Sequence, residues 1–116
     1  MPAAQKLKLG VLASGGGTNL QSIIDQCHEQ KIDAEIVLVL SNNPDAGALQ
    51  RAQKSGLPYT CINHRDFADR QSFDQAVVKT LQEAGVELVV LAGFMRIISE
   101  VFVDALKQRI INIHPA

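Results

Sequence analysis

The sequence predicts an α/β protein with a doubly wound parallel sheet. Five short apolar runs, rich in β-branched residues, alternate with segments of helical spacing along the 116-residue chain. The runs are nearly continuous rather than alternating, which is typical of parallel strands covered on both faces. Strands that alternate with helices form parallel sheets with right-handed crossovers. The predicted strands are Leu7–Ala13, Glu35–Leu40, Tyr59–Ile62, Glu87–Ala92 and Arg109–Ile113.

Two of the segments between these strands carry an apolar stripe that would pack against a sheet. The stripe of the first helix runs from Leu20 to Cys27, and that of the third helix runs from Phe73 to Ala84. Glycine is the commonest residue just beyond a helix end, because it adopts the left-handed conformation without strain. Gly56 and Gly85 therefore predict where the second and third helices end.

The helix starts are predicted from capping residues. Thr18, with Gln21 three residues later, is the pattern of a capping box at the start of the first helix. Asn43 would cap the second helix, with Pro44 at the first helical position. Ser99 would cap a short fourth helix that continues through residue 106.

Length, composition and charge exclude several classes of protein. A chain of 116 residues forms one domain at most, and 47% hydrophobic residues argue against disorder. The net charge of −1 argues against a nucleic-acid partner, which needs a concentrated basic face. No apolar run is long enough to span a membrane, and the N-terminus lacks the apolar core of a signal peptide, so we expect a cytoplasmic protein. Cys27 and Cys61 are expected to be ordinary buried or half-buried thiols without a metal.

A glycine loop follows the first predicted strand. Ligands of open α/β sheets bind beyond the carboxyl ends of the strands, and residues Ser14–Asn19 contain three consecutive glycines at that point. Glycines at the start of a helix let backbone N–H groups approach a phosphate. The spacing matches neither the dinucleotide motif nor the lysine-containing triphosphate loop. The loop therefore predicts a monophosphate site, with a tight turn that binds nothing as the alternative.

Asn112 and His114 are candidate catalytic residues at the end of the fifth strand. Residues two apart on a strand point to the same face, so both would enter one cleft. An amide that stabilises an oxyanion beside an imidazole that moves a proton suits acyl transfer. The alternative is that both residues only complete hydrogen bonds at the strand end. Among weaker candidates, Arg96 is a fair anion contact. His64 could line the cleft but is more simply loop structure, and His28 is expected to be solvated.

Four motifs, in this order and spacing, resemble the glycinamide ribonucleotide formyltransferase family. They are SGGGTNLQ at residues 14–21, SN at 41–42, LAGFMRI at 91–97 and NIHP at 112–115. The resemblance extends from Leu7 to the end of the chain and is specific because four separate motifs match. The last motif alone is shared with other folate-dependent formyl transferases and hydrolases.

The resemblance implies a Rossmann-like formyltransferase fold and a reaction. The enzyme transfers a formyl group from 10-formyltetrahydrofolate to the amine of glycinamide ribonucleotide in purine biosynthesis, without a metal. Asn112 and His114 would stabilise the tetrahedral intermediate and assist proton movement. The phosphate site would be Gly17, Thr18 and Asn19. The folate site would be Arg70, Met95, Arg96, Ile97, Ile98 and Asn112.

The family domain continues well beyond the His-Pro motif. The resemblance therefore implies that residues 1–116 are the N-terminal, nucleotide-binding part of a single formyltransferase domain, truncated after the fifth strand. The missing part supplies an aspartate that pairs with His114, so we expect these residues alone to be inactive. A homodimer is compatible with this interpretation.

Two other functions stay open. One is a different folate-dependent enzyme, such as methionyl-tRNA formyltransferase or formyltetrahydrofolate hydrolase, although the triple-glycine loop suits a small phosphate better. The other is a non-catalytic module that binds a phosphate or nucleotide.

Overall fold

The computed structural model describes residues 6–94, 99–107 and 109–113. Within these ranges the predicted alternation of strands and helices is confirmed, with boundaries that agree to within a few residues. The short 3-10 turn after the third strand was not predicted. The elements in chain order are β1 (Leu7–Leu12), α1 (Thr18–His28), β2 (Ala34–Ser41), α2 (Gly47–Lys54), β3 (Tyr59–Cys61), the 3-10 turn η1 (His64–Asp66), α3 (Arg70–Glu83), β4 (Leu88–Ala92), α4 (Glu100–Ala105) and β5 (Ile110–Ile113).

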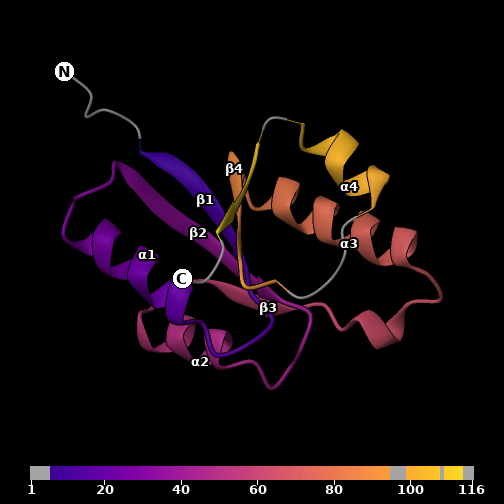
Figure 1. The fold of residues 1–116 in the computed structure, drawn as a ribbon, viewed down its shortest axis with the longest axis horizontal. Helices are drawn as coiled ribbons and strands as arrows, with labels where there is room; N and C mark the ends of the chain where they lie inside the picture. Colours follow the sequence, from indigo (N-terminus) through magenta and orange to yellow (C-terminus); the bar gives the residue numbers. More distant parts are fainter. Residues whose placement is uncertain (1–5, 95–98, 108, 114–116) are drawn as a thin grey trace.

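The five strands form one parallel sheet in the order β3-β2-β1-β4-β5. The helices α1 and α2 lie on one side of the sheet, and α3 and α4 lie on the other (Figure 1). The chain runs outward from β1 to β3, then returns to β4 on the opposite side of β1. This confirms the predicted doubly wound sheet and places its switch point between β1 and β4, where ligands of such sheets bind.

The core has two halves, one on each face of the sheet. Val11 packs with the α1 and α2 side, and its neighbour Leu12 packs with the α3 side; both are fully buried. Successive strand residues point to opposite faces, so a strand covered on both sides must be apolar at every position. This explains why the predicted strands are continuous apolar runs. None of the helices described here is long and apolar enough to cross a membrane.

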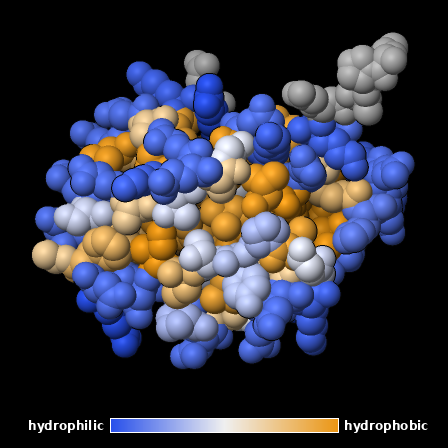
Figure 2. Space-filling view, turned by 180° about the vertical axis from the view of Figure 1, so that it is seen from behind, coloured by the Kyte–Doolittle hydropathy of each residue, from blue (hydrophilic) through white to orange (hydrophobic). Residues whose placement is uncertain are grey.

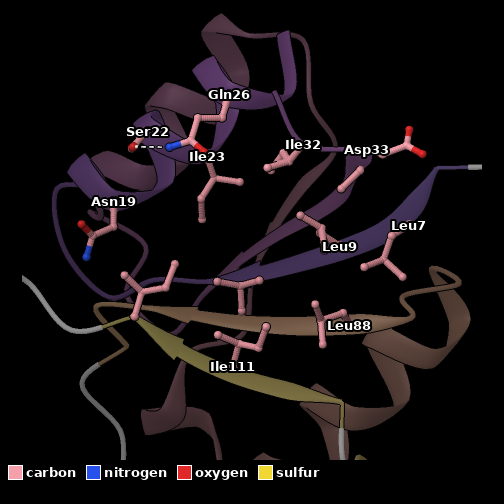
Figure 3. A pocket seen from close by; sticks show the side chains of 13 residues that line it. Leu7, Leu9, Asn19, Ser22, Ile23, Gln26, Ile32, Asp33, Leu88 and Ile111 are labelled. Carbon is pink, nitrogen blue, oxygen red and sulfur yellow. Dashed lines mark hydrogen bonds between the residues drawn. The ribbon is translucent and has the colours of Figure 1, made fainter. Parts of the chain in front are cut away.

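The helices leave part of the sheet uncovered. On their face of the sheet, α1 and α2 lie on the β2 and β3 side of β1. Among the described residues, no helix covers β4 and β5 on that face. A groove of about 480 Å³ remains there, between α1 and residues such as Leu9, Leu88 and Ile111 (Figure 3). The side chain of Ile111 is 48% exposed. Apolar residues also gather across the back of the molecule, between hydrophilic margins (Figure 2).

The predicted capping box at α1 is wrong. The residue that caps α1 is Gly17, with φ at 82°, and the helix has no side-chain cap. Thr18 is already inside the helix, and the side chain of Gln21 donates instead to Asp25 at 3.0 Å. A left-handed glycine turns the chain directly into the helix, so no hydroxyl is positioned to cap it.

The predicted start of α2 is also wrong, by three residues. Asn43 closes a local turn: its side chain accepts a hydrogen bond from the N–H of Asp45, and its carbonyl accepts one from the N–H of Ala46. The helix begins only at Gly47. Asparagine favours both helix caps and turns, and Asn43 forms the turn instead of the cap. The ends at Gly56 and Gly85 are confirmed, with φ of 70° and 78°.

Ser99 stands at the predicted cap position of α4, but its hydroxyl does not cap the helix. Its backbone N–H donates to the carboxylate of Asp74 on α3 at 2.7 Å. Asp74 is only 2% exposed, so this bond pairs a buried acceptor and ties the start of α4 to α3. The helix ends at Ala105, one residue before the predicted end.

The start of α3 is capped by Asp69, which the sequence analysis did not single out. Its carboxylate accepts a hydrogen bond from the N–H of Ser72 at 2.7 Å. Hydrogen bonds from the backbone and side chain of Ser72 lower the pKa of the Asp69 carboxyl below its ordinary value.

We predict that Asp69→Ala lowers the melting temperature at neutral pH but not in strong acid. The pKa of Asp69 is lower in the folded chain than in the unfolded chain, so its carboxylate stabilises the fold above the unfolded pKa. That contribution is lost as the pH falls through the folded pKa. Thermal unfolding at both pH values measures the effect. Asp66→Ala is the control, because no described residue bonds its carboxylate. An Asp69→Ala defect that persisted in acid would contradict the prediction.

Candidate functional site

The glycine loop lies at the switch point of the sheet and is tied to two neighbouring strand ends. The N–H of Ser14 donates to the carbonyl of Gly93, just after β4, at 3.2 Å. The hydroxyl of Ser14 donates to the side-chain oxygen of Asn42, just after β2, at 2.6 Å. Both polar side chains are buried, so these bonds fix where the loop leaves the sheet.

Each glycine carbonyl of this loop has a donor. The carbonyl of Gly15 accepts from the N–H of Ala48 in the first turn of α2 at 3.1 Å. The carbonyl of Gly16 accepts from Nε of Arg51, also on α2, at 2.6 Å. The carbonyl of Gly17 accepts from the N–H of Gln21 within α1 at 2.8 Å. Two of the three glycine carbonyls are therefore directed toward α2.

The loop packs closely on α2, with a glycine on each side of the contact. A Cβ on Gly17 would lie 2.8 Å from Cα of Ala48, and φ of Gly17 is 82°. A Cβ on Gly47 would lie 3.0 Å from the carbonyl oxygen of Gly16. At Gly15 and Gly16 a Cβ would meet open space. Gly47 in α2 is thus the contact partner of the glycine loop, although it lies outside the three-glycine motif in the sequence.

The N–H groups of the loop are left free to bind an anion. In a trans peptide the N–H points opposite to the carbonyl of the preceding residue. The carbonyls of Gly15 and Gly16 point to α2, so the N–H groups of Gly16 and Gly17 point away from it. No described residue accepts a hydrogen bond from the N–H groups of residues 15–20. Free N–H groups at the positive end of a helix form an anion-binding arrangement.

A polar pocket of about 500 Å³ lies beside this loop, beyond β1, β2 and β3. Asn42 lies at its base, with its side-chain nitrogen 3.4 Å from Nδ1 of His64. Because the oxygen of Asn42 accepts the Ser14 hydroxyl, its NH₂ group faces the imidazole, and Nδ1 of His64 is the acceptor. Of the two interpretations of His64, the structure favours the one in which it lines the cleft: it lies in η1 and lines this pocket.

Asn112 is the candidate catalytic residue that the structure describes. It pairs with Leu91 of β4, which pairs in turn with Leu12 of β1, so the three share one row across the sheet. Leu12 and Leu91 belong to the core on the α3 side, so the Asn112 side chain is on that face and is exposed. The predicted partner, His114, lies outside the described residues.

The predicted folate residues fall into two groups. Arg70 is exposed and is the first residue of α3, directly after its cap. Met95, Arg96, Ile97 and Ile98 lie outside the described residues. Among the described residues near them, Gly93 has a φ of 75°, and the N–H of Ser99 donates to Asp74.

The other sequence candidates behave as ordinary residues. His28 is exposed at the end of α1. Cys27 and Cys61 are free and half-buried, as predicted, and burial raises the pKa of both thiols. In residues 6–94, 99–107 and 109–113, no group of three or more His, Cys, Asp or Glu could hold a metal ion.

Comparison with known proteins decides the family of this chain. Residues 7–116 match the family model described as formyl transferase. The chain belongs to the formyl transferase family. This formyl transferase chain is 42% identical, over 109 residues, to a phosphoribosylglycinamide formyltransferase from Haemophilus influenzae; the match covers 94% of this chain and 51% of the relative.

Two further relatives show the same similarity. A trifunctional purine biosynthetic protein adenosine-3 from Drosophila melanogaster is 43% identical over 118 residues, which span 100% of this chain and 9% of that protein. The match to the crystal structure of glycinamide ribonucleotide transformylase 1 from Symbiobacterium toebii has a TM-score of 0.93 at 40% identity. This match covers 97% of this chain and 53% of that one. The predicted family and fold are confirmed. The chain spans about half the length of the single-function formyl transferases that it matches.

We predict that Gly17→Ala destabilises the fold, whereas Gly15→Ala does not. Alanine at residue 17 must adopt a left-handed conformation and move α2, which together cost about 1–3 kcal/mol. Alanine at residue 15 meets nothing within 4 Å, so its cost should stay within about 0.5 kcal/mol. Urea unfolding of both variants measures the difference. Equal stability of the two variants would show that the loop does not depend on its contact with α2.

Proposed function

We propose that the protein containing this chain transfers a formyl group from 10-formyltetrahydrofolate to the amine of glycinamide ribonucleotide, a step of purine biosynthesis in the cytoplasm. One observation carries the proposal: in a member of the formyl transferase family, the glycine loop turns free N–H groups away from α2 at the switch point of the sheet. A ribonucleotide phosphate suits such a site. The relatives named phosphoribosylglycinamide formyltransferase support the same choice of substrate.

The phosphate would bind to Gly17, Thr18 and Asn19. Their N–H groups have no acceptor among the described residues, and they stand at the first turn of α1, where the helix dipole favours an anion. Backbone donors bind a phosphate without a lysine. The net charge of −1 is therefore no obstacle to binding a single phosphate group.

The formyl donor would bind across the ends of β4 and β5. Of the residues proposed to hold it, Arg70 offers an exposed guanidinium and Asn112 an exposed amide, both on the α3 side of the sheet. Met95, Arg96, Ile97 and Ile98 would supply the remaining contacts. The donor brings the formyl group, and these side chains orient it and exclude water.

Asn112 and His114 would carry the chemistry. The NH₂ group of Asn112 would donate to the formyl oxygen, which gains negative charge as the amine attacks. His114 would take part in moving the amine proton, which an imidazole can do near neutral pH. Residues 1–116 would then be the N-terminal, nucleotide-binding part of the domain, and the acidic partner of His114 would come from outside them.

The decisive test is formyl transfer by the intact protein from 10-formyltetrahydrofolate to glycinamide ribonucleotide. We expect turnover with the ribonucleotide, none with the 116-residue chain alone, and competition by inorganic phosphate at the glycine loop. Formylation of methionyl-tRNA, or hydrolysis of the donor without an acceptor, would replace the proposal with a related enzyme. Phosphate binding without any turnover would indicate a non-catalytic module.

We predict that Asn112→Ala lowers kcat of the intact protein by about 10²–10³-fold, a larger effect than its weakening of formyl-donor binding. The amide would act mainly on charge that develops only in the transition state, so its loss should lower kcat more than it raises the Kd of the formyl donor, and should leave the Kd of the ribonucleotide unchanged. Steady-state kinetics and calorimetric titration separate the two effects. Gln82→Ala, which removes an exposed amide from α3, is the control. A kcat close to that of wild type would show that Asn112 only shapes the strand end.

A further inference from the structure

The side chain of Arg51 joins α2 to both the glycine loop and α1. Its Nε donates to the carbonyl of Gly16 at 2.6 Å, and another guanidinium nitrogen donates to the side-chain oxygen of Gln21 at 3.3 Å. Both acceptors are neutral and lie at least 30 residues away along the chain. No carboxylate of the described residues pairs with Arg51. Among the described residues, the Arg51 guanidinium donates hydrogen bonds only to the loop and the first turns of α1.

We propose that Arg51 is a positioning residue for the phosphate site. It would hold the peptide between Gly16 and Gly17 with its carbonyl toward α2, so that the N–H of Gly17 faces the ligand. Arg51 itself lies on the carbonyl side of this peptide and would not touch the phosphate. This inference rests on the proposed function of the glycine loop.

The peptide between Gly16 and Gly17 needs such an anchor. The two peptides beside it are held by backbone groups: Ala48 binds the carbonyl of Gly15, and Gln21 binds that of Gly17. Among the described residues, only Arg51 binds the carbonyl of Gly16. Gly16 is exposed, and a Cβ there would meet nothing within 4 Å, so no side-chain contact fixes its conformation, although its backbone lies against Gly47 of α2. A glycine peptide without an anchor rotates at little cost and loses its orientation.

The guanidinium suits this role better than an ammonium. Its rigid, planar donors can bind the Gly16 carbonyl and Gln21 together, whereas the single ammonium of lysine has no fixed geometry. Lys54 provides a matched comparison, because it lies one turn further along α2 and lines, together with Arg51, Gly16 and Gln21, a pocket of about 300 Å³. It carries the same charge but makes no hydrogen bond to a described residue, so it reports the effect of charge alone.

The test compares Arg51→Met, Arg51→Lys and Lys54→Met in the intact protein. Affinity for glycinamide ribonucleotide is measured by calorimetry, beside affinity for the formyl donor and for the riboside that lacks the phosphate. We expect Arg51→Met to weaken ribonucleotide binding about tenfold. That is the effect of losing one charge-assisted hydrogen bond, here the bond from the N–H of Gly17 to the phosphate. Arg51→Lys should lie between Arg51→Met and wild type, and Lys54→Met should stay within about twofold of wild type. Binding of the donor and of the riboside should not change.

Each departure from this pattern has a definite meaning. Equal losses in Arg51→Met and Lys54→Met would show that charge, not positioning, is responsible, and would overturn the proposal. So would a loss that extended to the riboside or to the donor, because a general structural defect would then explain it. If Arg51→Met does not fold, wild-type affinity in Arg51→Lys would overturn the proposal. A wild-type protein that bound the donor but not the ribonucleotide would refute the proposed function, and this role with it.

Discussion

The contact between the glycine loop and the start of α2 is the constraint on which the candidate site depends. Gly17 lies against the backbone of Ala48, and Gly15 accepts a hydrogen bond from the same residue. This contact requires glycine at residue 17, sets the entry of the chain into α1 and directs the loop carbonyls away from the ligand side. The parallel sheet makes the contact available, because the carboxyl ends of β1 and β2 lie side by side.

The sequence predicted the framework well because the framework is set by local signals. Continuous apolar runs identify strands covered on both faces, and glycines such as Gly56 and Gly85 mark helix ends wherever the chain needs a left-handed residue. The helix starts were harder to predict. Thr18 and Asn43 are good caps in isolation, but the first lies inside a helix that a glycine caps, and the second closes a turn of its own.

The candidate site was predictable only in part, and the reason is distance along the chain. The glycine loop and Asn112 stand out locally, because the loop directly follows an apolar strand and Asn112 interrupts one. Arg51 does not stand out, and His64 is only a weak candidate, since each gains its importance from residues more than 20 positions away. An arginine on a polar helix face and a histidine in a loop are ordinary in a sequence. Only the fold shows that one reaches the carbonyl of Gly16 and the other reaches Asn42.

The dependence of the loop on α2 links ligand affinity to the assembly of the fold. The N–H groups that would bind the phosphate belong to the connection between β1 and α1. Their orientation, however, is set by α2, which follows β2 in the chain. An isolated β1–α1 unit would contain all the donors and still lack their arrangement. A ligand at this loop therefore favours only those molecules in which α2 is docked, so it stabilises the docking of α2 by mass action. Protection of the α2 amides from hydrogen exchange becomes a direct measure of occupancy at a site that α2 itself need not touch.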